Sequence, residues 1–177
     1  MKTLDLAPSK IVIKQGDITL EEVDIIVTAA NSRLAGGGGV DGAIHRAAGF
    51  ELNEACRAIR QKIGLCEPGF AVITKAGKLK AKNVIHAVGP VWQGGMSQER
   101  DTLISAYRSA LQLAVENGAK IISFPSISTG SFGYPIDHAA PAAIAAIKAF
   151  LKDSPPLEVR LILFTEDDYK TYEKYLK

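Results

Sequence analysis

The sequence predicts a three-layer α/β/α domain, in which helices cover both faces of a central sheet of about six strands. Strand-like runs alternate with segments of helical spacing along the chain. Several runs are continuously apolar, such as Asp24-Ile25-Ile26-Val27, which is typical of strands covered on both faces. The length of 177 residues fits one domain, residues 1–177, better than two.

Each element is predicted from a local pattern. Runs of β-branched and aliphatic residues indicate strands, and apolar residues that recur every three to four positions indicate helices. The second helical segment ends at Gly118, a favoured residue just after a helix C-terminus. The expected strands are Ile11 to Lys14, Val23 to Thr28, Phe70 to Thr74, Asn83 to Ala87, Lys120 to Phe124 and Val159 to Phe164, and the expected helices are Val40 to Ala48, Leu103 to Ala114 and Ala140 to Leu151.

Composition and charge exclude several classes of protein. Hydrophobic residues make up 47% and charged residues 23%, which excludes a disordered or fibrous chain. The net charge of +2 is too near neutral for a general nucleic-acid binder. The lysines between Lys75 and Lys82 are interpreted as a solvated connection between two strands. No signal peptide or membrane-spanning run is apparent, so we expect a cytoplasmic protein.

The cysteines and histidines give no metal signature. Cys56 and Cys66 form no C-x-x-C pair and have no histidine beside them in the sequence, so we expect neither a zinc site nor a redox motif. We expect both to be small buried hydrophobic residues or exposed thiols. His45, His86 and His138 lack metal-ligand spacing and are interpreted as structural. We therefore expect no metal and no cofactor.

The strongest functional signal is a run of four glycines, Gly36 to Gly39, between a strand end and a helix. Glycines are costly to order, so such a run suggests a backbone that approaches a ligand closely or adopts a positive φ. The helix N-terminus would offer free N–H groups and a positive dipole to an anionic diphosphate. A flexible surface loop is the alternative. Asp41, in the first helical turn, is either a functional carboxylate or only a complement to the helix dipole.

The sequence gives little support to three other nucleotide-binding or hydrolase motifs. Gly37-x-Gly39-x-x-Gly42 formally matches the dinucleotide fingerprint of a nicotinamide-dependent oxidoreductase. Five residues separate Ala30 from Gly36, however, and no acidic residue ends the next strand at Lys75, which disfavours that reading. No Gly-Lys-Ser/Thr follows the glycines, and no Gly-x-Ser-x-Gly elbow occurs, which excludes a Walker A loop and a serine hydrolase of that type.

A second loop, Phe124 to Pro135, places hydroxyls, glycines and aromatic rings between a strand and an alanine-rich helix. On its own it reads as an ordinary strand-to-helix turn. Together with the glycine run it would form a cleft of backbone donors that holds a diphosphate from both sides.

Two strand ends carry further candidates. Asp17 could accept a hydrogen bond from an exocyclic amine such as adenine N6, or could simply form a turn. Phe164 could belong to the core or stack on a base. The expected helix caps are Thr19 with Glu22, and Thr165 with Asp168.

Five segments occur together in the order and spacing of a known family: Gly16 to Thr19, Ala29 to Asn31, Gly36 to Gly49, Val84 to Pro90 and Ile127 to Pro135. They resemble macrodomains of the MacroD type, and the resemblance extends from about Ile11 to the C-terminus. The greatest similarity is to bacterial enzymes that deacetylate O-acetyl-ADP-ribose and remove ADP-ribose from acidic side chains.

The resemblance implies a mixed sheet between helices, with ADP-ribose bound at the strand ends. It implies a monomeric hydrolase that acts on O-acetyl-ADP-ribose and mono-ADP-ribosylated proteins, cleaves an ester on the distal ribose, and needs no cofactor, membrane or nucleic acid. Asn31 would bind the distal ribose hydroxyls and Asp41 would act on the water or on a ribose hydroxyl. The other implied ADP-ribose contacts are Asp17, Ile18 and Phe164 at the adenine, and Gly37, Gly38, Gly39, Val40, Ser128, Thr129, Gly130, Ser131, Phe132, Gly133 and Tyr134 around the diphosphate and distal ribose.

The sequence departs from the family pattern at two positions. Thr28 replaces a common Asn at the strand end, and we expect this to alter strand-end hydrogen bonding more than catalysis. Phe132 replaces a frequent Tyr, which keeps stacking on the distal ribose but removes a hydroxyl. Either Asp41 or the substrate diphosphate could activate the water. The alternative function is a non-catalytic ADP-ribose reader, which the joint presence of Asn31 and Asp41 disfavours.

Overall fold

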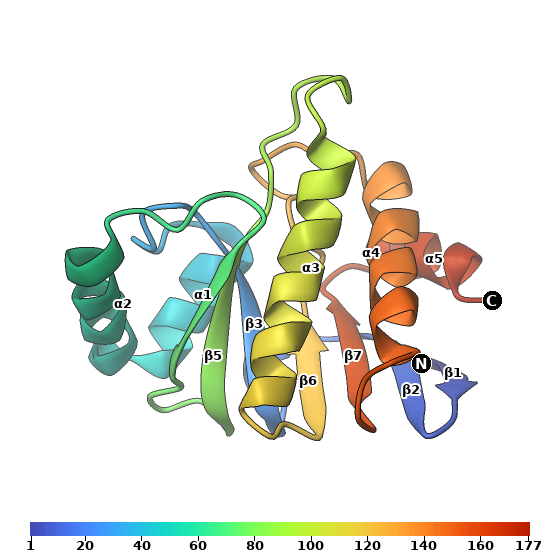
Figure 1. Ribbon diagram of the computed structural model, residues 1–177, viewed down its shortest axis with the longest axis horizontal. Coiled ribbons are helices and arrows are strands. Elements are labelled where there is room, and N and C mark those ends of the chain that lie inside the picture. Colours follow the sequence, from blue (N-terminus) through green and yellow to red (C-terminus); the bar gives the residue numbers. More distant parts are fainter.

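Seven strands form one mixed sheet at the centre of the computed structural model, which describes residues 1–177 (Figure 1). The spatial order is β1-β2-β7-β6-β3-β5-β4. The five middle strands run parallel, and each edge strand is antiparallel to its neighbour. The strands are β1 (Lys2–Leu6), β2 (Ser9–Gln15), β3 (Val23–Ala30), β4 (Ala71–Lys75), β5 (Ala81–Val88), β6 (Ile121–Phe124) and β7 (Glu158–Leu163).

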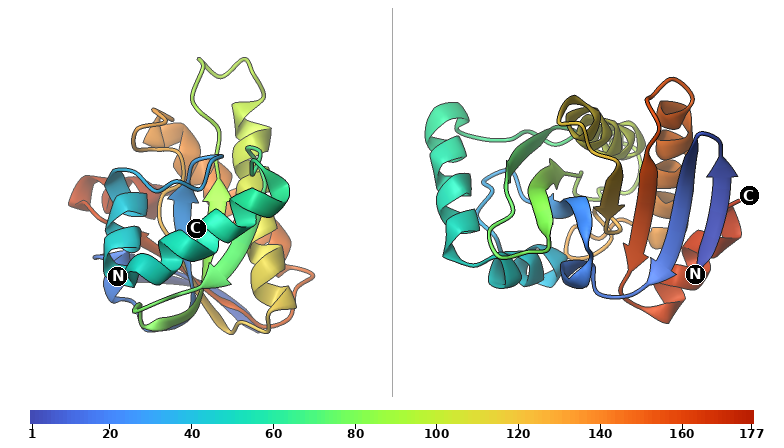
Figure 2. Two further views of the ribbon diagram at one scale, coloured as in Figure 1. Left: turned by 90° about the vertical axis from the view of Figure 1, so that its left-hand side faces the viewer. Right: turned by 90° about the horizontal axis from the view of Figure 1, so that it is seen from below.

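Helices cover both faces of this sheet, as predicted (Figure 2). Because side chains alternate along a strand, Ile25 and Val27 of β3 pack with α3 and α4, whereas Ile26 packs with α1 and α2 on the opposite face. The helices are η1 (a 3₁₀ turn, Ile18–Leu20), α1 (Gly39–Ala48), α2 (Phe50–Ile63), α3 (Glu99–Glu116), α4 (Ile136–Leu151) and α5 (Glu166–Tyr175).

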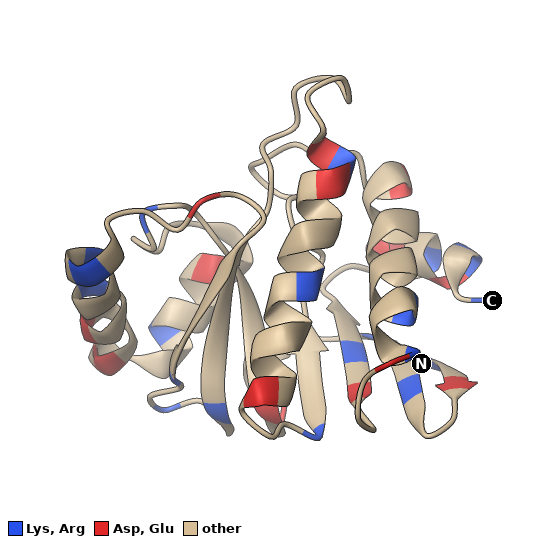
Figure 3. Ribbon diagram, viewed as in Figure 1, with Lys and Arg blue, Asp and Glu red and all other residues tan.

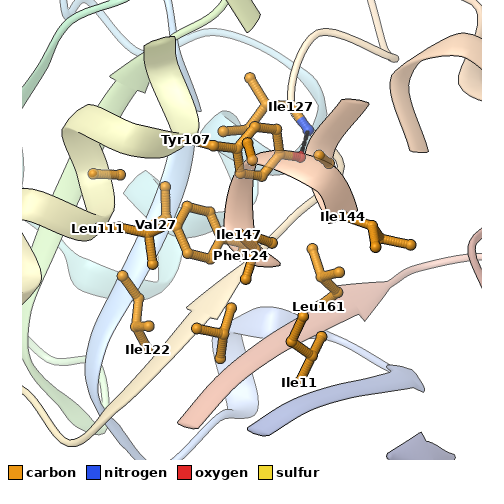
Figure 4. Packing of buried hydrophobic residues seen from close by; sticks show 14 of the residues in the cluster. Ile11, Val27, Tyr107, Leu111, Ile122, Phe124, Ile127, Ile144, Ile147 and Leu161 are labelled. Atoms are coloured by element: carbon orange, nitrogen blue, oxygen red, sulfur yellow. Dashed lines mark hydrogen bonds between the residues drawn. The ribbon is translucent and has the colours of Figure 1, made fainter. Parts of the chain in front are cut away.

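The larger core lies between the sheet and the helices α3 and α4 (Figure 4). Phe124 and Tyr107 pack together there, with ring centroids 5.2 Å apart. The Tyr107 hydroxyl accepts a hydrogen bond from the backbone N–H of Ile127 at 3.1 Å. The core therefore fixes the start of the loop between β6 and α4.

Strand register brings the predicted site segments together. Ala30 at the end of β3 pairs with Val88 of β5, and Gln15 at the end of β2 pairs with Leu163 of β7. The carboxyl ends of parallel strands meet at one edge of a sheet, which is where α/β folds bind ligands. Asn31, Asp17 and Phe164, each within two residues of these pairs, follow at the same edge.

The structure adds elements that the sequence analysis missed. The sheet has seven strands rather than about six, because the exposed edge strand β1 contributes only Leu4 and Leu6 to the core. The helix α2 was not predicted because it buries only Leu52 and Cys56, which is too few for a clear apolar face. Only the cap of α5 at Thr165 was predicted, because this helix buries just Thr171 and Tyr172.

One predicted cap is wrong and one is confirmed. Thr19 does not cap a helix with Glu22; instead, Asp17 caps η1 and accepts from the Thr19 N–H at 2.9 Å. A short aspartate at the residue before the turn reaches the orphan N–H more directly than Thr19 can. Thr165 caps α5, as predicted, by accepting from the N–H of Asp168 at 3.1 Å.

Charges are interspersed over the elements (Figure 3). The lysines of the connection between β4 and β5 are exposed, as expected, and two of them, Lys80 and Lys82, pair with Glu22 and Asp24. Both cysteines are buried free thiols. No helix combines the length and the apolar character that crossing a membrane requires.

Candidate functional site

Two adjoining cavities lie at the carboxyl edge of the sheet. The smaller, of about 180 Å³, is enclosed by the ends of β3 and β5 and by the two predicted loops. The larger, of about 590 Å³, lies over the ends of β2 and β7 and has the size of a small-molecule site, about 300–1,000 Å³. Gly39, Val40, Ser126 and Gly130 line both cavities, so the two form one continuous site.

The segment from Gly36 to Gly42, called the glycine segment below, adopts a backbone conformation that requires glycine at several positions. Gly36 and Gly39 have φ of +73° and +59°, a region that other residues rarely adopt. A Cβ on Gly42 would lie only 2.2 Å from the carbonyl oxygen of Gly37, so the segment folds tightly onto the first turn of α1. Gly38 precedes α1 without a side-chain cap, which leaves the first N–H groups of the helix available to an anion.

Asn31 ties this segment together. Its side-chain amide donates to the carbonyl of Gly36 at 2.8 Å, and its side-chain oxygen accepts from the N–H of Ala35 at 3.2 Å. An amide group has two donor hydrogens and two acceptor lone pairs, so each end of Asn31 keeps capacity for a ligand in the smaller cavity that it lines.

Asp41 lines the same cavity and is only 6% exposed. Its Oδ1 accepts from the Thr28 hydroxyl at 2.7 Å. The same oxygen lies 3.5 Å from Nε2 of His45, the distance of an ion pair. Both contacts use one carboxylate oxygen, which leaves the other free to take a proton. Thr28, the strand position that departs from the family pattern, therefore bonds directly to the candidate catalytic carboxylate.

His45 is a site residue that the sequence analysis set aside as structural. Its Nδ1 lies 2.7 Å from Oδ1 of Asn53; since an amide oxygen only accepts, Nδ1 carries a hydrogen there. The Asp41 carboxylate, more than the Asn53 contact, raises the pKa of His45 against the opposing effect of burial. The spacing of Asp41 and His45, four residues apart on one helix, is the signal that could have found this pair.

The loop between β6 and α4 closes the other side of the cavity. Ser128 has φ of +69°, is 4% exposed, and its buried hydroxyl has no hydrogen-bond partner. A Cβ on Gly89 would lie 2.1 Å from that hydroxyl, so the end of β5 and this loop are in close contact. Ser131 and Phe132 also line the smaller cavity.

Two predicted contacts of this loop line neither cavity. Tyr134 is 3% exposed and packs against Trp92 with ring centroids 4.6 Å apart, so its side chain is part of the support behind the site. Gly133 has φ of +71° and turns the chain toward Tyr134. Thr129, by contrast, lines the larger cavity.

The larger cavity contains the three residues predicted at the adenine: Asp17, Ile18 and Phe164. Phe164 is 76% exposed, which excludes the core reading and leaves its ring free to stack. One oxygen of Asp17 is used to cap η1, and the other remains available as an acceptor. Arg46 of α1 also lines this cavity and was missed by the sequence analysis; its guanidinium suits a phosphate.

Potential metal ligands gather behind Asp41. One ligand atom each of His45, Cys56 and His86 lie within 4.8 Å of one another. Cys56 Sγ is 3.8 Å from both ring nitrogens of His86, so it lies equally far from the two. His86 Nε2 is also bonded to Thr74 at 2.9 Å. These groups fit a hydrogen-bonded buried cluster better than a metal centre.

Burial dominates the electrostatics of this cluster. It raises the pKa of the Cys56 thiol to about 11 and lowers the pKa of His86 to about 4. The ring of His45 meets that of His86 edge-on, with centroids 6.1 Å apart. The buried groups behind Asp41, Cys56 and His86, are therefore both uncharged near pH 7.

Comparison with known proteins gives consistent matches. The model of the family described as Macro domain matches residues 27–143. An O-acetyl-ADP-ribose deacetylase of Enterobacter sp. (strain 638) is 55% identical over 162 residues, which cover 91% of this chain and 90% of that protein. A macro domain-containing protein of Caldanaerobacter subterraneus subsp. tengcongensis is 53% identical over 165 residues, covering 93% of this chain and 94% of that protein.

Solved structures agree with the sequence matches. The Oceanobacillus iheyensis macrodomain with ADP superposes with a TM-score of 0.95 and 42% identity, covering 99% of this chain and 94% of that one. The Trypanosoma brucei macrodomain in complex with ADP-ribose gives a TM-score of 0.84 and 40% identity, covering 94% of this chain and 69% of that one.

Proposed function

This chain belongs to the Macro domain family, and on that premise we propose that it binds ADP-ribose and hydrolyses an ester on the distal ribose. The observation that carries the proposal is the position of Asp41: a carboxylate buried at the N-terminus of α1, beside Asn31 in one cavity, with Oδ1 held by Thr28 and Oδ2 free. A module that only binds ADP-ribose has no need of a carboxylate held in this way.

The two cavities suit the parts of ADP-ribose. The adenine lies in the larger cavity, with its N6 amine toward Asp17 and its ring against Phe164. The diphosphate lies where the cavities join, between Val40 on the glycine segment and Gly130 on the opposite loop, and receives backbone N–H groups. The distal ribose enters the smaller cavity, where Asn31 binds its hydroxyls.

The reaction needs a base, an oriented water and stabilisation of the developing oxyanion. Water adds to the ester carbonyl carbon, its proton passes to Asp41, and the bond from that carbon to the ribose oxygen breaks. The ribose oxygen takes the proton back as the alcohol, and the acyl group leaves as a carboxylic acid. The substrate diphosphate is the alternative group to orient the water, in which case Asp41 only positions the ribose.

The same ester bond to the distal ribose occurs in two candidate substrates. In O-acetyl-ADP-ribose the acyl group is acetyl, and in a protein modified on Glu or Asp it is the side-chain carboxyl. We propose that this chain acts on both, as a monomer and with residues 1–177 as one domain. The similarity to the Enterobacter deacetylase supports the first substrate directly, and the shared bond supports the second.

The test is product release by the wild-type protein from O-acetyl-ADP-ribose and from a protein mono-ADP-ribosylated on Glu or Asp, with ADP-ribose binding measured by calorimetry. We expect binding and release of acetate and of ADP-ribose. Binding without release from either substrate would identify a reader. Absence of ADP-ribose binding would overturn the assignment of both cavities.

A further inference from the structure

The segment between β5 and α3 rises above the strand ends at the top of Figure 1. It carries two glycines with positive φ, Gly94 and Gly95, and its tip residue Met96 is 92% exposed. Such a segment would be mobile unless something fixed it. We call residues 92–98 the strap.

A buried carboxylate fixes the strap. Glu99, the first residue of α3, is 2% exposed. Its Oε1 accepts from the N–H groups of Gln93 at 2.8 Å and Gly95 at 3.0 Å, and its Oε2 accepts from the N–H of Ser97 at 2.8 Å. These backbone bonds outweigh the opposing effect of burial and lower the pKa of Glu99. Only an acceptor-only group satisfies three converging N–H donors.

The strap is joined to the site through Trp92. The backbone N–H of Trp92 donates to the backbone carbonyl of Phe132 at 2.8 Å. The indole ring packs on Tyr134 with centroids 4.6 Å apart and stacks on His138 at 6.1 Å. Phe132 lines the smaller cavity together with Asn31 and Asp41. A continuous series of contacts therefore leads from Glu99 to the wall of that cavity.

We propose that Glu99 is a positioning residue for the distal end of the site: by fixing the strap it holds Trp92, and through Trp92 it holds Phe132 where the distal ribose binds. The identity of the ligand rests on the proposed function. No strap residue lines the larger cavity, and Phe132 lines only the smaller one, so the effect of Glu99 should be confined to ligands that reach the smaller cavity.

The test compares two nucleotides that differ at that end. ADP lacks the distal ribose and ADP-ribose contains it. In Glu99→Gln an NH₂ group replaces one of the two carboxylate oxygens. Because that NH₂ group cannot accept a hydrogen bond from the backbone N–H that faces it, part of the strap loses its anchor. We expect the Kd for ADP-ribose to rise about tenfold, as for the loss of one hydrogen bond to a charged group, and the Kd for ADP to change less than about twofold.

Asp101→Asn is the matched control. Asp101 lies in the same first turn of α3 and interacts with the same helix dipole, but it is exposed. We expect it to leave both Kd values unchanged. Trp92 is the only tryptophan of the chain, so its fluorescence reports the strap directly. The emission of Glu99→Gln should shift to longer wavelength as the indole gains water, and that of Asp101→Asn should not.

Gly95→Ala is a second variant should Glu99→Gln fail to fold. A Cβ there would lie 2.9 Å from the Trp92 ring and would displace the strap without touching the carboxylate. The same pattern, weaker ADP-ribose binding with ADP binding retained, supports the inference. Equal weakening of both nucleotides, or no change in either, overturns it. A wild-type protein that binds neither nucleotide overturns the proposed function and this inference with it.

Discussion

At the scale of single residues, Asp41 is held from three elements. Thr28 of β3 donates to its Oδ1, His45 of α1 lies beside the same oxygen, and Asn53 of α2 orients His45. A carboxylate with one oxygen fixed in this way keeps its orientation while the other oxygen exchanges a proton. Thr28, at the position where the family commonly has Asn, is the hydrogen-bond donor to this carboxylate.

Thr28→Val tests that hydrogen bond. Valine has the shape of threonine but no donor, so the ionised Asp41 loses its 2.7 Å partner. We expect kcat for the ester substrate to fall about tenfold, since a hydrogen bond to a charged group contributes about 1.5–3 kcal/mol.

The control for this prediction is Thr28→Ser, which restores the hydroxyl and should restore kcat. Steady-state kinetics on the ester substrate provides the measurement. A valine variant with wild-type kcat would show that the contact has no part in the reaction.

Sequence reasoning identified Asp41 and Asn31 but not how they are held. Asp41 stood out because of its place after the glycines, and Asn31 because of the family motif. The partner roles of Thr28, His45 and Asn53 depend on side-chain directions and on the packing of α2 beside α1, which local patterns do not contain. Only the spacing of Asp41 and His45 on one helix gave a usable hint.

At the scale of elements, the glycine segment and the first turn of α1 behave as one unit. Gly42 lets the helix approach the carbonyl of Gly37, and the four glycines then line the smaller cavity while Gly39 also lines the larger one. The sequence predicted this unit because glycine runs have a clear conformational cost. It missed β1 and α2, and predicted only the cap of α5, because the exposed or weakly apolar faces of these elements resemble loop sequence.

Gly42→Ala tests the close approach. The added methyl would lie 2.2 Å from the Gly37 oxygen, so the segment must shift. Overpacking of this kind costs about 1–3 kcal/mol, and we expect the Tm to fall by about 5 °C. Thermal unfolding followed by circular dichroism provides the measurement.

Gly38→Ala is the control for Gly42→Ala. Gly38 has φ of −95°, and a Cβ there would meet nothing within 4 Å. Its Tm should stay within about 1 °C of the wild type, because surface substitutions usually change stability by less than about 0.5 kcal/mol. Equal Tm values for both variants would refute the close approach of Gly37 to α1.

At the scale of the whole molecule, the sheet combines a binding edge with a buried polar cluster below it. Parallel strands end at one edge, so the segments after β2, β3, β5, β6 and β7 assemble there from distant parts of the sequence. This arrangement followed from the fold class. The cluster of His86, Cys56 and Thr74 did not, because it depends on how β4, β5 and α2 pack.

Because His86 is buried, we expect the folded protein to lose stability as the pH falls. Burial lowers its pKa to about 4 in the folded protein, against an ordinary value of about 6.5. The unfolded chain therefore binds a proton to this residue below about pH 6.5 while the folded protein does not, so its contribution to stability is lost as the pH falls toward 4. Between pH 7 and pH 5 the wild type should lose about 2 kcal/mol more than His86→Gln.

Urea unfolding at several pH values measures this slope. His138→Gln is the matched control, since His138 is exposed, and it should keep the wild-type slope. If His86→Gln and the wild type lose the same stability over that range, His86 is not buried as a neutral group in the folded protein.

The most direct test of the proposed hydrolysis is the turnover of O-acetyl-ADP-ribose by Asp41→Asn, with ADP-ribose binding measured calorimetrically on the same preparation. Asparagine keeps the size of the side chain but cannot act as a base. If Asp41 is the base, kcat falls by about 10²–10⁴-fold while the Kd for ADP-ribose changes less than about threefold. Wild-type turnover in a variant that still binds ADP-ribose would contradict this role and leave the substrate diphosphate as the group that activates the water.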